Sequence, residues 1–148
     1  YIGRQGVSLV DARGEAGLTY PVAEYGQLDP LLQRSSAATG VVVYRDDAIP
    51  ALTNLLLFGD NPSGEVFSVQ ADQLPEGGQE AIRRVLFTFQ DDGEAKTLLQ
   101  LVQEKNVEQG KSPSARADLR FGSGPDEQVL ILNKQDGVIR LLVPDGSP

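Results

Sequence analysis

Short apolar runs that alternate with tight polar bends constrain the fold of this chain more than any other feature. The stretch "LLLFGDNPSGEVFSVQ", residues 55–70, has two apolar runs on either side of a bend at Asn61, Pro62, Ser63 and Gly64. Such runs, roughly four to eight residues long and bounded by turn residues, are typical of antiparallel strands. The chain is therefore expected to be an all-β protein made of antiparallel hairpins.

The clearest predicted hairpin is "QVLILNKQDGVIRLLV", residues 128–143, in which apolar positions alternate on both sides of Asp136-Gly137. Glycine accepts the positive φ that a tight hairpin turn requires, and aspartate tolerates the neighbouring position. Further bends are expected near residues 14, 62 and 92. The other predicted strands include "VSLV" (7–10), "TGVVVYR" (39–45) and "RRVLFTF" (83–89).

Two stretches are compatible with a short helix instead of a strand. They are "GGQEAIRR" (77–84) and "AKTLLQLVQEKN" (95–106), and in the second Leu98, Leu101 and Val102 fall on one helical face. The polar segments 74–78 and 104–115 contain glycine and proline, so we expect them to be exposed loops.

Composition excludes several kinds of function. The 21 acidic and 13 basic residues give a formal charge of −8, which argues against binding to nucleic acid. The chain has no cysteine and no histidine. It therefore holds no thiolate nucleophile, no Ser-His-Asp triad and no cysteine-based metal site, and we predict no catalytic residue and no metal ligand within it. No stretch approaches the roughly 20 apolar residues of a membrane span.

The chain opens with Tyr1 and contains no methionine, so we expect residues 1–148 to be one C-terminal segment of a longer protein, without separate domains. Roughly six to eight strands are compatible with an independent β-sandwich. They are equally compatible with two to three blades of a β-propeller, at about 40–50 residues per blade.

Three segments taken in order resemble the C-terminal part of the glucose/sorbosone dehydrogenase family. They are "YPVAEYGQ", "SSAATGVVVYRDDAIPALTNLLLFGDNPSGEVFSV" and "RADLRFGSGPDEQVLILNKQDGVIRLL". The resemblance runs from about residue 20 to residue 142, with residues 72–108 unmatched. It implies two to three blades of a six-bladed β-propeller, a periplasmic or extracellular location, and oxidation of a sugar with pyrroloquinoline quinone (PQQ). This chain would contribute blades and one wall of the cofactor and sugar pocket.

The family's histidine base and calcium ligands belong to earlier blades, so the resemblance assigns neither to this chain. Its cofactor-binding run, Arg-x-Arg-Asp, matches "SARADLRFG", with Ala115 and Ala117 at the two arginine positions. These departures count against PQQ binding. The resemblance leaves Arg116, Asp118 and Arg120 as cofactor-binding candidates, which we expect to alternate on one strand. The alternative is a ladder of salt bridges on a sheet face.

Tyr44 and Arg45 end a predicted strand and are candidates for sugar binding, the alternative being a tyrosine that only packs. Around Asn61, the acidic turn lacks the spacing of a calcium-binding EF-hand, so turn chemistry explains it better.

A non-catalytic propeller that binds a carbohydrate or a protein partner is the rival function. In either case two or three blades leave strand edges and apolar faces exposed, and we expect the remaining blades or a second copy to cover them.

Overall fold

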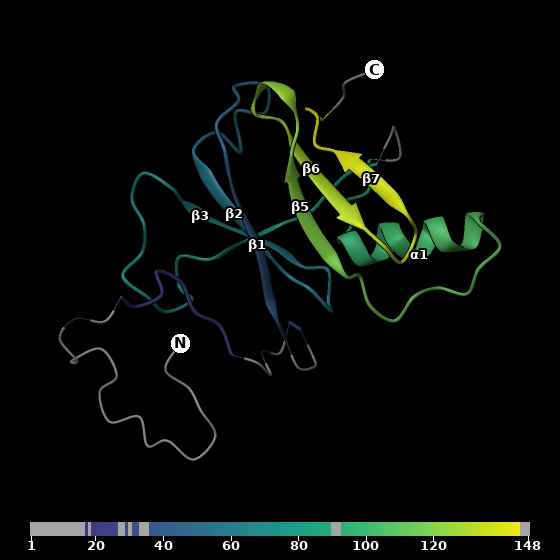
Figure 1. Cartoon of the computed structure of the whole chain (residues 1–148), viewed down its shortest axis with the longest axis horizontal. Coiled ribbons are helices and arrows are strands. Elements are labelled where there is room, and N and C mark those ends of the chain that lie inside the picture. Colours follow the sequence, from purple (N-terminus) through teal and green to yellow (C-terminus); the bar gives the residue numbers. More distant parts are fainter. Residues whose placement is uncertain are drawn as a thin grey trace, which may run out of the picture.

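The computed structural model describes residues 17, 19–26, 29, 31–32, 36–89 and 93–145. These residues form two antiparallel sheets, one of four strands in the order β1-β2-β3-β4 and one of three in the order β5-β6-β7 (Figure 1). The expectation of an all-β protein of antiparallel hairpins is confirmed in its main part, since the described residues are mostly β with one short helix. The elements are β1 (Ala38–Tyr44), β2 (Leu55–Asp60), β3 (Val66–Gln70), β4 (Arg83–Val85), α1 (Leu98–Glu108), β5 (Leu119–Ser123), the 3-10 turn η3 (Pro125–Glu127), β6 (Val129–Asn133) and β7 (Val138–Leu141).

Both predicted hairpins form. β2 pairs with β3, and Phe58 lies opposite Phe67. β6 pairs with β7 around the turn that contains Asp136 and Gly137, where the φ of Gly137 is 74°. Each hairpin joins strands that are close in sequence, so local turn chemistry is enough to fix it.

The segment between the sheets departs from several expectations. The predicted strand over residues 83–89 is shorter, since β4 ends at Val85 and Phe87 forms only an isolated bridge with Lys96. The helix considered for residues 77–84 does not form. Gly77 and Gly78 have φ values of 109° and 72°, which are incompatible with a helix. The predicted strand over residues 7–10 and the bends near residues 14 and 92 lie outside the described residues.

The second predicted helix is present as α1, and its buried face includes Leu98, Leu101 and Val102 as expected. It continues to Glu108, so the expected loop over residues 104–115 is wrong in its first part. Asn106 in the last turn of the helix is buried, and its side-chain amide donates a hydrogen bond to the carbonyl oxygen of Gln135 at 3.0 Å. A tertiary contact therefore anchors the last turn of α1, whose end at Glu108 lies two residues beyond the predicted helix.

A capping box begins α1. The Thr97 hydroxyl accepts a hydrogen bond from the Gln100 N–H at 3.2 Å, and the Gln100 side chain accepts one from the Thr97 N–H at 2.8 Å. We expect Thr97→Ala to lower the free energy of unfolding by about 1 kcal/mol, because the Gln100 N–H loses the hydroxyl that accepts its hydrogen bond. Urea denaturation measures the change. Thr97→Ser keeps the hydroxyl and should stay close to the original stability, and equal losses in both variants would contradict the assignment.

The two sheets pack face to face around a shared core. Leu57 and Gly59 of β2 face the second sheet, where Leu119 and Ile131 are fully buried. A Cβ built on Gly59 would lie 2.0 Å from the Leu119 Cδ2 atom. The absence of a side chain at Gly59 therefore allows Leu119 to pack directly against the backbone of β2.

The first strands of the two sheets, β1 and β5, lie side by side (Figure 1). Gly40 near the start of β1 meets the ring of Phe121, and a Cβ there would lie 2.6 Å from its Cδ2 atom. The end of β1 at Tyr44 packs with Val129, which pairs with Ser123 at the end of β5. The two strands consequently run in the same direction, although no ladder joins them.

The outer faces of the sheets differ. Phe58 and Phe67 on the outer face of the first sheet are covered by Leu32 and Tyr25. The outer face of the second sheet has apolar side chains that remain exposed, Ile139 at 64% and Leu141 at 42%. None of the helices in the described part of the chain has the length and apolarity needed to cross a membrane.

Candidate functional site

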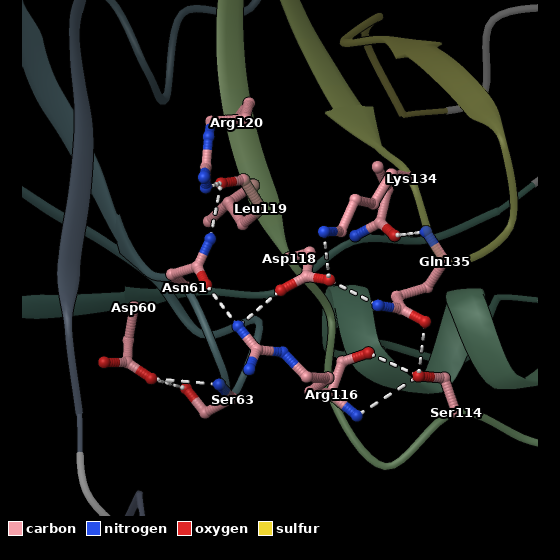
Figure 2. A network of polar contacts seen from close by, with 11 residues as sticks. Asp60, Asn61, Ser63, Ser114, Arg116, Asp118, Leu119, Arg120, Lys134 and Gln135 are labelled. Carbon is pink, nitrogen blue, oxygen red and sulfur yellow. Dashed lines mark hydrogen bonds and ion pairs between the residues drawn. The ribbon is translucent and has the colours of Figure 1, made fainter.

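A network of polar side chains lies where β2 ends, β5 begins and β6 turns into β7 (Figure 2). Its members come from three segments that are far apart in sequence: residues 60–63, 114–120 and 134–135. The close packing of Gly59 on Leu119 brings the first two segments together, and the pairing of Leu119 with Asn133 brings in the third.

Asp118 is the centre of this network. Its side chain is 8% exposed and forms an ion pair with the Arg116 Nη2 atom at 2.5 Å. It also accepts a hydrogen bond from the Gln135 side-chain amide, and the Lys134 Nζ atom lies at 3.6 Å. Burial alone would raise the pKa of Asp118, but the donors Gln135, Arg116 and Lys134 together lower it below the ordinary value. The carboxylate is therefore held in its charged form.

Asn61 links the two candidate arginines. Its side-chain oxygen accepts a hydrogen bond from the Arg116 Nη2 atom at 2.9 Å, and its amide nitrogen donates to the Leu119 carbonyl oxygen at 3.2 Å. The Arg120 Nη1 atom donates to the same carbonyl oxygen at 2.6 Å. One chain of hydrogen bonds thus joins Arg116, Asn61 and Arg120 (Figure 2).

The expectation that Arg116, Asp118 and Arg120 alternate on one strand is wrong. β5 begins at Leu119, and Asp118 has a φ of 56°, in the left-handed region. This conformation breaks the alternation of side chains that a strand would give. Arg116 and Asp118 therefore pair within the segment before β5, and Arg120 alone lies on the strand.

The acidic turn after β2 serves local structure, as predicted. Fully buried Asp60 accepts hydrogen bonds from the Ala37 N–H at 2.6 Å and from the Ser63 N–H and hydroxyl at 3.0 and 2.6 Å. Glu65 forms a bidentate pair with Arg84, with both distances 2.6 Å. In the part of the chain that the structure describes, no group of three or more acidic side chains is arranged to hold a metal ion.

Tyr44 and Arg45 lie at the opposite end of the sheets from Asp118. Tyr44 is 1% exposed, and its hydroxyl oxygen accepts a hydrogen bond from the Ile49 N–H at 3.2 Å. Its ring belongs to the core, in agreement with the packing alternative. Arg45 is exposed and bonds to Asn54 and Asp72 at 2.5 and 3.1 Å. The residues predicted for cofactor and for sugar therefore do not meet in one pocket of this chain.

The geometry leaves Arg116 as the side chain best placed to bind an external group. Its side chain is 51% exposed, and only its Nη2 atom is engaged by Asp118 and Asn61. Among the described residues, nothing engages its Nε and Nη1 atoms. An oriented guanidinium with free N–H groups is suited to a planar anion such as a carboxylate.

Ala117, at the second arginine position of the family pattern, lies in the core. It is fully buried, and a Cβ on Gly64 would lie 2.7 Å from its Cβ atom. A longer side chain has no room there, so the alanine is a consequence of packing between the sheets.

Sequence reasoning missed Gln135, Ser114 and Lys134 as members of the network. Gln135 donates to Asp118, and its side-chain oxygen lies 3.2 Å from the Ser114 hydroxyl, which donates to it. These contacts join positions about twenty residues apart through a sheet register, and no local motif marks them.

No protein-family model matches the chain, and no curated protein or solved structure matches it either.

Proposed function

We propose that this chain forms two adjacent blades of a β-propeller similar to the glucose/sorbosone dehydrogenases. The observation that carries the proposal is the arrangement of β1 and β5. Each begins an antiparallel meander, the two strands run in the same direction side by side, and the meanders pack face to face. Blades of a propeller repeat one meander around a central channel, which requires this relation between neighbouring sheets.

Within that architecture, Arg116 would supply one wall of an anion-binding pocket. Asp118 and Asn61 fix the orientation of its guanidinium, so less conformational entropy is lost when a ligand binds. PQQ, when bound, accepts the hydride from the sugar. Arg116 would hold one of its carboxylates, while the buried methyl group of Ala117 offers no hydrogen-bond donor and Arg120 donates to the backbone of Leu119. This chain thus contributes a single arginine to the clamp, and the base and calcium ligands would come from other blades.

The test is a titration of PQQ, in the presence of calcium, into the full-length natural polypeptide, followed by visible absorbance and dye-linked oxidation of aldoses. We expect uptake of the cofactor, and we expect Arg116→Ala to weaken it about tenfold, because one charge-assisted hydrogen bond is lost. Arg83→Ala removes an equal charge from exposed β4 and is the matched control. Equal affinity in the Arg116→Ala and Arg83→Ala proteins would contradict the role of Arg116.

A non-catalytic propeller that binds a carbohydrate or a protein is the second candidate. It is favoured by the burial of Ala117 at the second arginine position and by the position of Tyr44 in the core. Absence of PQQ uptake at saturating concentration, by a protein with the circular dichroism of folded β-sheet, would contradict the dehydrogenase proposal. The same polypeptide should then be tested for binding to glycans.

A further inference from the structure

β7 is an edge strand of the second sheet, since it pairs only with β6 in the described part of the chain. The Leu142 N–H, just after β7, donates to the Val129 carbonyl oxygen at 3.1 Å. Peptide groups in an antiparallel strand point alternately to the two sides. Ile139 and Leu141 therefore direct their N–H and C=O groups away from β6, toward the free edge.

A groove with a volume of about 280 Å³ runs beside this edge. Phe87 and Phe89 line it from the segment after β4, and Leu98 and Leu101 line it from α1. The far wall of the groove is thus apolar, and the near wall is a strand with unpaired peptide groups. An extended peptide suits this edge, since its backbone pairs with β7 and its side chains lie alternately on the groove face, beside Arg140, and on the outer face, beside Ile139 and Leu141.

Arg140, which also lines the groove, gives the site a charge preference. Its Nη2 atom is paired with the fully buried Asp136 carboxylate at 2.5 Å, and the Arg140 side chain is only 12% exposed. Its Nε and Nη1 atoms are buried and have no hydrogen-bond partner. Buried guanidinium donors without acceptors are costly, so an additional acceptor on the same face of the sheet would be stabilising.

We propose that the edge of β7 binds an extended, acidic peptide segment as an added antiparallel strand. A carboxylate of that segment would lie opposite Arg140, where cross-strand neighbours share a face. Apolar side chains on either side of it would lie opposite Ile139 and Leu141, which are exposed at present. A second copy of the chain fits less well, because β7 itself has no acidic residue to offer. The inference does not depend on the propeller or on its ligand.

The probe is the peptide acetyl-Thr-Val-Glu-Val-Thr-amide, titrated into the 148-residue chain and followed by the amide resonances of residues 138–142. In antiparallel register its glutamate lies opposite Arg140, and its two valines lie opposite Ile139 and Leu141. We expect shifts at these residues, slower hydrogen exchange at the Ile139 and Leu141 amides, and about fivefold weaker binding when glutamine replaces the glutamate.

Two controls separate strand addition from simple contact. N-methylation of both valines removes the N–H groups that would pair with β7 and should abolish binding, whereas N-methylation of the glutamate should be tolerated because that N–H points away. Arg140→Met should remove the preference for glutamate over glutamine and leave the requirement for the valine N–H groups. No shift at millimolar peptide, or equal binding by the valine-methylated peptide, would overturn the proposal.

Discussion

Leu119→Ala should lower the free energy of unfolding by about 3 kcal/mol, one of the two largest effects that we expect in this chain. Leu119 is fully buried where the two sheets meet, and its Cδ2 atom occupies the space that a side chain on Gly59 would take. Truncation leaves a cavity between the sheets that the glycine opposite cannot fill. Urea denaturation of the 148-residue chain measures the change.

A double-mutant cycle with Gly59→Ala makes this prediction specific. Alone, Gly59→Ala should cost about 2 kcal/mol, because the new methyl group collides with the closely packed Leu119 side chain. In the Leu119→Ala background the same methyl group enters the cavity, so the added cost should fall close to zero or become favourable. Strictly additive losses would show that β2 and β5 do not pack against each other.

Asp118→Ala should cost a similar amount, about 3 kcal/mol, for two reasons. The substitution removes the acceptor that Arg116 and Gln135 share, and it places alanine at a φ of 56°, a conformation that aspartate and asparagine tolerate better. Asp118→Asn keeps the shape and the backbone preference and removes only the charge. We therefore expect Asp118→Asn to cost about 2 kcal/mol, and equal losses in the two variants would contradict a contribution from the backbone.

The pH dependence of the same comparison follows from the lowered pKa of Asp118. Its folded-state pKa lies below the ordinary value of 3.8, so the charged carboxylate contributes stability that is fully present above that value. This contribution is lost as the pH falls through the folded-state pKa. The stability gap between the original chain and Asp118→Asn should be constant above about pH 5 and should close below pH 3.8. A gap that stays constant to the lowest pH at which the chain folds would contradict the assignment.

The sequence predicted the hairpins because their determinants are local. The bend at Asn61–Gly64 and the turn at Asp136-Gly137 each carry residues suited to their backbone conformation, between strands that pair directly. The buried face of α1 was likewise readable from the spacing of Leu98, Leu101 and Val102. In each case the information lies within about fifteen residues.

The candidate site was less predictable because its contacts are not local. Arg116 reaches Asn61 across 55 positions, and the left-handed backbone of Asp118 moves the start of β5 to Leu119. The alternation of residues along a presumed strand predicts neither the contact between Arg116 and Asn61 nor the start of β5 at Leu119. Tyr44 shares its core cluster with Val129 of the other sheet. The surroundings of these side chains therefore depend on contacts between the two sheets, which local sequence patterns do not show.

The separation of the two meanders also has a consequence for how the chain folds. Every ladder within a sheet joins strands that are neighbours in sequence, whereas the contacts between the sheets join residues near 40–60 with residues near 117–131. Closing so long a loop costs entropy that only the complete interface repays. Each meander pairs through contacts that are local in sequence, whereas the docking of Leu119 against Gly59 has to overcome this loop-closure entropy.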